Sequence, residues 1–236
     1  MLIAGFPAAA FGTNCYVVAP DAGEDCVVVD PGVDVVPQLD RVLAEHRLRP
    51  VAVLLTHGHI DHTFSVAPVC GARGIPAYIH PGDDELLADP MLGLSPETRA
   101  LFGGRLEWTE PDDVKPLVDG APLRIAGLEI TVDHAPGHTR GSVAFRLPDR
   151  DEGGSEVMLS GDLLFAGSIG RTDLPGGDHA TMLRSLASKV LPLADDVVVL
   201  PGHGEQTTIG RERSTNPFLR GLVAGTPGAA GPGRGL

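Results

Sequence analysis

Three histidines and an aspartate stand together in one short segment, Thr56-His57-Gly58-His59-Ile60-Asp61-His62. It follows residues 51–55, a wholly apolar run that is typical of a strand buried on both faces. Imidazole nitrogens and carboxylate oxygens are the ligands that ions such as zinc prefer. In an extended chain His57 and His59 point to the same side, and a turn through Asp61 and His62 aims two more ligands at a neighbouring point. A merely polar turn would satisfy these ionisable groups poorly, so the segment predicts ligands for two adjacent metal ions.

Three further segments place one ligand-type side chain beside a glycine, each directly after a predicted strand. They are Pro136-Gly137-His138, Gly161-Asp162 and Pro201-Gly202-His203. Glycine lets the chain turn tightly and approach an ion. One such turn is common, but three of them, together with the histidine-rich segment, predict a single metal site.

Strand-like and helix-like stretches alternate along the chain. Strands are predicted at 14–19, 26–30, 51–55, 75–79, 123–125, 128–133, 142–147, 156–160 and 197–200, and helices at 35–48, 64–73 and 179–190. Residues 81–116, rich in Pro, Asp and Gly, are expected to form short helices and loops. Two β-rich halves with helices outside predict an α/β fold in which packed sheets are covered by helices. We expect one domain over residues 1–221 and a disordered Gly/Pro-rich tail over 222–236, because such a tail buries too little apolar surface to fold.

Composition narrows the range of partners. The formal net charge is −13, from 18 basic and 31 acidic residues, which disfavours nucleic acids and anionic membranes. Bound metal ions would offset that charge locally, so an anionic small molecule remains a suitable substrate. Three cysteines without metal-type spacing and the lack of a recognisable signal or membrane segment favour a cytoplasmic protein with reduced thiols. A monomer or a small homo-oligomer is expected.

The pattern H-x-H-x-D-H, followed by separate His, Asp and His ligands, resembles the metallo-β-lactamase superfamily. Within it the chain is similar to short bacterial members of the glyoxalase II group, the hydroxyacylglutathione hydrolases. The similarity also covers Asp30-Pro31-Gly32, residues 135–142, residues 170–177 and Asn216-Pro217-Phe218. It implies an αββα four-layer sandwich. It also implies two divalent ions, with zinc expected first and iron or manganese also suited. By this resemblance the first ion is held by His57, His59 and His138, the second by Asp61, His62 and His203, and Asp162 lies between them.

The implied activity is hydrolysis of a thioester such as S-lactoylglutathione. Two cations that share a water lower its pKa from ~15.7 towards ~7, so that hydroxide is available to attack a carbonyl carbon. A thiolate leaves with little need for protonation, which suits a site without an obvious separate acid. Asp61 and Asp162 are the expected catalytic carboxylates. Arg171 is expected either to contact the thiol carrier or to pair with a nearby aspartate.

Four other readings stay open. A related persulfide dioxygenase would use a single iron on His57, His138 and Asp162, and a lactone or β-lactam hydrolase would share both metals. A nuclease is disfavoured by the acidic surface, and a non-catalytic binding protein is disfavoured by the complete ligand set. Of the remaining histidines, His46, His80 and His179 are expected to be structural, and His134 is expected to be structural or to orient a ligand.

Overall fold

The computed structural model describes residues 1–101, 108–148 and 155–223. Its first sheet has six strands in the order β1-β2-β3-β4-β5-β6. They are β1 (Leu2–Pro7), β2 (Asn14–Ala19), β3 (Asp25–Val29), β4 (Arg49–Leu54), β5 (Ala77–Ile79) and β6 (Val114–Pro116). The first three strands pair antiparallel, and β3 to β6 pair parallel.

The second sheet also has six strands, in the order β14-β13-β10-β9-β8-β7. They are β7 (Pro122–Ile125), β8 (Leu128–His134), β9 (Val143–Pro148), β10 (Glu156–Gly161), β13 (Val198–Pro201) and β14 (Thr207–Thr208). Only the β10–β13 pair is parallel. Between these two strands the chain forms a separate hairpin of β11 (Leu164–Phe165) and β12 (Ser168–Ile169).

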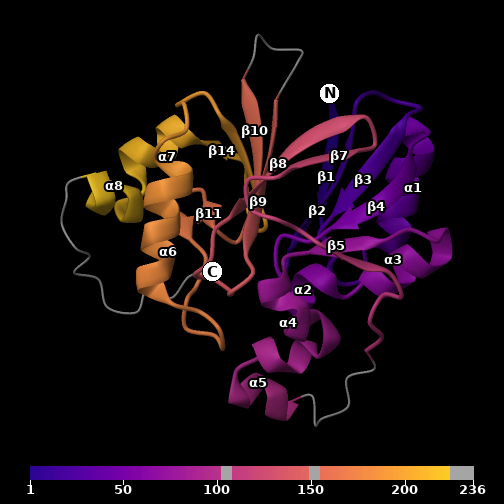
Figure 1. Ribbon diagram of the computed structural model, residues 1–236, viewed down its shortest axis with the longest axis horizontal. Coiled ribbons are helices and arrows are strands. Elements are labelled where there is room, and N and C mark those ends of the chain that lie inside the picture. Colours follow the sequence, from indigo (N-terminus) through magenta and orange to yellow (C-terminus); the bar gives the residue numbers. More distant parts are fainter. Residues whose placement is uncertain (102–107, 149–154, 224–236) are drawn as a thin grey trace.

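Helices lie outside both sheets and over one end of them (Figure 1). The α-helices are α1 (Val36–His46), α2 (Ile60–Thr63), α3 (Val66–Arg73), α4 (Asp84–Ala88), α5 (Pro96–Leu101), α6 (His179–Ser185), α7 (Ile209–Thr215) and α8 (Pro217–Val223). Two 3-10 turns, η1 (Pro81–Asp83) and η2 (Pro90–Gly93), flank α4, and a π-helical turn, η3 (Leu186–Val190), extends α6. None of the helices in the described ranges has the length and apolar composition needed to cross a membrane.

Side-chain alternation on the strands produces three apolar layers. On β3, Cys26 and Val28 pack towards α1 and α3, whereas Val27 and Val29 pack towards the second sheet. On the far side of the second sheet, Met158 of β10 packs with residues of α6, η3, α7 and α8. Because strands of the first sheet are buried on both faces, they are apolar at successive positions rather than at alternate ones. The result is an αββα sandwich, which confirms the predicted fold.

Backbone hydrogen bonds join the two sheets at the edge where the predicted ligands lie. The Val143 N–H, at the start of β9, donates to the Thr56 carbonyl after β4 at 2.8 Å. The Asn14 N–H, at the start of β2, donates to the Gly202 carbonyl after β13 at 2.7 Å. Strand ends from both halves of the chain are thereby held together at one edge of the sandwich.

Two predicted segments need correction. The stretch 81–116 contains the expected short helices, but it also contains β6, which pairs only with β5 at the sheet edge and so tolerates Pro116. The expected tail begins too early, because Leu222 and Val223 belong to α8. The rest of that tail, 224–236, and residues 102–107 lie outside the described residues.

Candidate metal centre

The histidine-rich loop, residues 56–62, leaves the end of β4 and enters the one-turn helix α2. The part of the loop before α2 and the part inside α2 contribute side chains to two different groups of candidate ligands. His57 precedes the helix, His59 is its N-cap in extended backbone, and Asp61 and His62 lie inside it. His62 is fully buried, and the exposed fractions of His57 and His59 are 1% and 6%. Buried imidazoles need defined partners, and the loop finds these partners on the second sheet.

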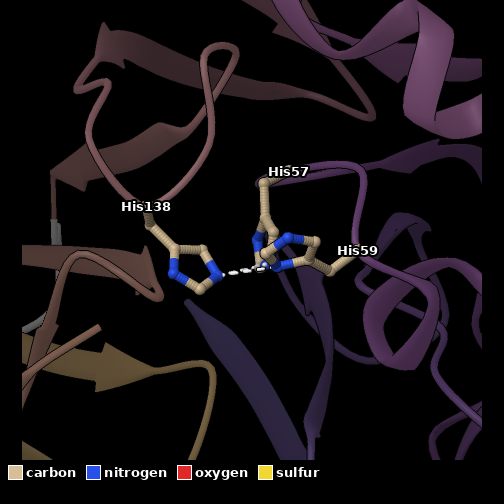
Figure 2. A group of neighbouring side chains, drawn as sticks. All are labelled: His57, His59 and His138. Atoms are coloured by element: carbon tan, nitrogen blue, oxygen red, sulfur yellow. Dashed lines mark hydrogen bonds between the residues drawn. The ribbon is translucent and has the colours of Figure 1, made fainter. Parts of the chain in front are cut away.

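The first triad consists of His57, His59 and His138, whose rings point at one another in Figure 2. His138 lies in the β8–β9 loop, residues 135–142. Its Nε2 is 2.8 Å from Nδ1 of His59 and 3.2 Å from Nε2 of His57. The three nitrogens therefore converge on one point between the two sheets.

The second triad consists of Asp61, His62 and His203. Nε2 of His203 is 3.3 Å from Nε2 of His62 and 3.2 Å from Oδ2 of Asp61. Asp162, directly after β10, lies between the triads. Its Oδ1 is 3.4 Å from Nε2 of His62, and its Oδ2 is 3.4 Å from Nε2 of His138. The seven predicted ligands are thus brought together around two adjacent points.

Asp30 orients the ring nitrogens of two of these histidines. It lies just after β3 with a φ of 49°, and its side chain is buried. Its Oδ2 accepts hydrogen bonds from Nδ1–H of His62 at 2.9 Å and from the Thr56 hydroxyl at 2.6 Å. The Thr56 oxygen, whose proton is so engaged, accepts from Nδ1–H of His57 at 3.0 Å. When the two rings are neutral, both Nε2 atoms consequently present lone pairs to the site, which is how supporting residues fix metal-binding imidazoles.

A backbone carbonyl fixes the orientation and the ring proton of His138. Its Nδ1–H donates to the carbonyl oxygen of Arg171 at 2.7 Å, and because a carbonyl can only accept, the ring proton must lie on Nδ1. The Arg171 side chain instead donates two hydrogen bonds to Asp173, at 2.7 and 2.8 Å. The pairing alternative considered for Arg171 is therefore realised in this structure.

The pKa values divide the site into a neutral half and a charged half. Burial, together with the neighbouring imidazoles, holds the pKa of His57 well below its usual range and lowers the pKa of His59 to about 3. Both rings are neutral at pH 7. Burial alone would raise the pKa of Asp162, but His62 and His138 bring it down to about 2. In the same way His62 and His203 hold the pKa of Asp61 low against the effect of its burial.

Burial would lower the pKa of His62, but Asp61 and Asp162 raise it well above its usual range. The two carboxylates therefore attract positive charge into this half of the site. A proton on an imidazole can supply that charge, and so can a divalent ion. The donor set of neutral imidazoles and ionised carboxylates is the one that zinc, iron and manganese accept.

The contacts in the site themselves call for a cation. Oδ1 of Asp162 is buried and makes no hydrogen bond with any described residue. Nε2 of His62 lies 3.4 Å from this oxygen, and a buried carboxylate is costly unless a protonated imidazole or a metal ion neutralises it. The converging imidazole nitrogens likewise have more lone pairs than protons. The residues present therefore fit divalent metal ions.

Two glycines allow the chain to crowd against Asp162. A Cβ at Gly202 would overlap Oδ1 of Asp162, and a Cβ at Gly170 would overlap its carbonyl oxygen. The two glycines come from the segments after β13 and after β12. Glycine is needed at both positions because the backbone passes so close to the carboxylate.

The other histidines lie outside the triads. His80 and His134 stack on each other with ring centroids 3.9 Å apart, and His134 donates through Nε2 to the Arg140 carbonyl. His179 follows Asp178, whose carboxylate caps α6 as expected. Sequence reasoning missed the supporting roles of Asp30 and Thr56 and also missed Asp83. The sequence offered a signal for the role of Asp30, which belongs to the motif Asp30-Pro31-Gly32 noted above.

Comparison with known proteins places the chain in a family. A family model described as the metallo-beta-lactamase superfamily matches residues 8–203, which include all seven predicted ligands. An uncharacterized protein of Mycobacterium tuberculosis is 49% identical over 223 residues, covering 94% of this chain and 99% of the relative. The hydroxyacylglutathione hydrolase GloC of Haemophilus influenzae is 34% identical over 214 residues, covering 90% of this chain and 95% of the relative.

Solved structures of related proteins have the same fold. The BLEG-1 B3 metallo-beta-lactamase superposes with a TM-score of 0.79 at 39% identity, covering 92% of this chain and 99% of its own. TTHA1623, solved in a di-iron-bound form, gives 0.75 at 39% identity, covering 92% of this chain and 100% of its own. From its matched family, its fold and its clustered ligands, the chain is a metallo-hydrolase of the metallo-beta-lactamase superfamily.

Proposed function

We propose that this chain is a thioester hydrolase that works with two divalent metal ions and cleaves an acyl-thiol such as S-lactoylglutathione. The observation that carries the proposal is the position of Asp162 between the triads: Oδ1 lies beside His62, and Oδ2 lies beside both His138 and His203. The similarity to the hydroxyacylglutathione hydrolase GloC supports the substrate class.

Each triad would hold one ion, and Asp162 would contact both. Bound there, the ions would supply an activated water near neutral pH and polarise a carbonyl oxygen. Zinc suits the ligand set, and iron is an alternative supported by the di-iron form of TTHA1623. The chain contributes orientation, because Asp30 and the Arg171 carbonyl fix three imidazoles. Asp61 is fixed in the same way, since the Thr13 hydroxyl donates to its Oδ2 at 3.1 Å.

Thioesters match what the chain supplies. Asp61 and Asp162 are ionised at neutral pH, so they are acceptors and can orient a water between the triads. A thiolate is a good enough leaving group to depart without a proton donor. An ester or amide would need such a donor at its leaving oxygen or nitrogen.

Arg171 is the proposed contact for an anionic part of the thiol carrier. Its backbone is fixed beside His138, which places its half-exposed side chain near the site. A substrate carboxylate would replace Asp173 as the partner of the guanidinium. An Arg171→Ala change should then raise KM about tenfold, or ~1.4 kcal/mol, with little change in kcat. Asp173→Asn should lower KM. Unchanged kinetics in both variants would leave Arg171 a role only in fastening its loop.

β-Lactam hydrolysis is the second candidate, favoured by the likeness to BLEG-1. β-Lactam hydrolysis would use the same metal-ligating residues, and the carbonyl attacked would be that of the lactam ring. Turnover of a cephalosporin that matches or exceeds thioester turnover would make it the leading function.

The deciding experiment measures bound metal and S-lactoylglutathione hydrolysis on the same purified sample. Two ions per chain with thioester cleavage is the expected result. His59→Ala should lose more activity than the roughly 10–100-fold that removal of a supporting residue costs. The control is His46→Ala, at the end of α1, which should keep full activity. A single iron with oxygen consumption on a persulfide would instead make the chain a persulfide dioxygenase.

A further inference from the structure

Asp83 is a buried carboxylate that contacts none of the predicted ligand atoms. It is the last residue of η1, after β5, and its exposed fraction is 0%. Oδ2 accepts hydrogen bonds from the Gly58 N–H at 2.9 Å and from the Thr139 hydroxyl at 2.6 Å. Oδ1 accepts from the Gly141 N–H at 2.6 Å. Within the described part of the chain, all of these hydrogen bonds to the Asp83 side chain therefore come from two loops.

Those loops are the ones that carry the first triad. Gly58 lies between His57 and His59, and Thr139 directly follows His138. The histidine-rich loop extends from the first sheet and the β8–β9 loop from the second. Asp83 therefore links the two sheets at the point where the three imidazoles must meet.

The second triad depends on different partners. Asp61 accepts from Thr13, and His62 donates to Asp30. Asp83 has no hydrogen bond to any of its members among the described residues. Its influence on the site should thus be confined to one of the two triads.

Only a carboxylate satisfies the donors around Asp83. Each of its oxygens faces a backbone N–H, that of Gly58 at Oδ2 and that of Gly141 at Oδ1. An asparagine of the same shape would place its NH2 group against one of those two N–H groups, whichever way the amide is turned. The opposed donors would move apart and take a ligand loop with them.

We propose that Asp83 is a positioning residue for the first triad and sets the affinity of that half of the site for a divalent ion. It acts by fixing the distance between the histidine-rich loop and the β8–β9 loop. The proposal rests on the proposed function only in that the cluster binds metal. It does not depend on which carbonyl substrate is cleaved.

The test measures the affinity of cobalt(II) for variants that retain a single triad. His203→Ala removes a ligand of the second triad, and His59→Ala removes one of the first. Adding Asp83→Asn should weaken cobalt binding about 10–100-fold in the His203→Ala protein and should leave it unchanged in the His59→Ala protein. The cobalt absorption spectrum should change only in the former.

The control is Asp89→Asn in both backgrounds. Asp89 also accepts a backbone N–H, from Met91, but it is exposed, and its side chain has no hydrogen bond to either ligand loop among the described residues. It should leave cobalt binding unchanged. Equal weakening of both triads by Asp83→Asn, or no weakening of either, would overturn the proposal.

A second pair of variants serves if Asp83→Asn does not fold. Thr139→Val removes one donor to Asp83, whereas Thr139→Ser retains the hydroxyl. Valine should weaken cobalt binding to the first triad and serine should restore it. Identical affinities in the two variants would also contradict the proposed role.

Discussion

The three cysteines are single residues whose chemistry depends on burial. Cys15, Cys26 and Cys70 are free thiols in the apolar layer between the first sheet and helices α1 and α3. Burial raises the pKa of Cys26 and of Cys70 to about 12, and it raises the pKa of Cys15 further. At pH 8 an aromatic disulfide reagent should therefore react slowly with the folded protein and rapidly with all three thiols after unfolding.

The same shift predicts alkaline destabilisation. Folded thiols keep protons that unfolded thiols, with a pKa near ~8.5, release. The contribution of the thiols to the free energy of unfolding should be constant below pH ~8.5 and fall above about pH 9, by up to ~1.4 kcal/mol per pH unit for each thiol. Urea titrations between pH 7 and 10 measure this. A free energy that stays level to pH 10 would contradict it.

Single residues also show what sequence alone can predict. The seven candidate ligands were predictable because they belong to ligand chemical types and follow strands, either clustered in one loop or next to a glycine. Asp83 was not, because it belongs to a Pro-Gly-Asp-Asp segment that is typical of an exposed turn. Its partners are 25 to 58 residues away in sequence. Which carboxylate is buried depends on those distant loops.

Among the elements, the β11–β12 hairpin depends on one buried side chain of α7. Glu212 accepts hydrogen bonds from the Gly167 N–H at the hairpin turn, the Thr207 hydroxyl and the Asn216 amide. The hairpin in turn leads to Gly170, which packs on Asp162. Helix α7 therefore supports the loop that packs against Asp162.

Glu212→Ala should lower the free energy of unfolding by roughly 2–4 kcal/mol, because it leaves buried donors without acceptors. Glu212→Gln should cost ~1 kcal/mol or less, since the Thr207 hydroxyl can rotate and accept from the new amide. Urea denaturation of the two variants gives the comparison. Equal losses would show that the side chain only fills space.

Strands differ in how well their sequences reveal them. β4 was predicted because it is apolar at successive positions, and the structure buries it between α-helices and the second sheet. β6 was missed because it has three residues and is mostly exposed at the sheet edge. Short edge strands bury little, so burial leaves no periodic signal in their sequence.

At the scale of the whole molecule, the metal centre is a link between two sheets. Each triad takes residues from both halves of the sandwich. An ion that binds only the folded state at 1,000 times its Kd adds ~4.1 kcal/mol. Removal of one such ion by a chelator should lower Tm by roughly 10 °C, given ~2–4 °C per kcal/mol for a chain of this size, and removal of two by about twice as much.

Differential scanning calorimetry of the loaded and metal-free protein measures this shift. His46→Ala serves again as the control and should show the same difference in Tm between the loaded and metal-free protein as the unaltered chain. A variant that carries both His59→Ala and His203→Ala should show a smaller one. A metal-free protein with an unchanged Tm would mean that ions do not stabilise the sandwich.

The order of the ligands along the chain has a consequence during synthesis. A ribosome adds on the order of 5–20 residues per second, so His59 is made several seconds before His138, and His203 follows several seconds later still. The first triad exists as a set before the second can be completed. A nascent chain therefore passes through a period in which the first triad, Asp61 and Asp162 have all been made but His203 has not.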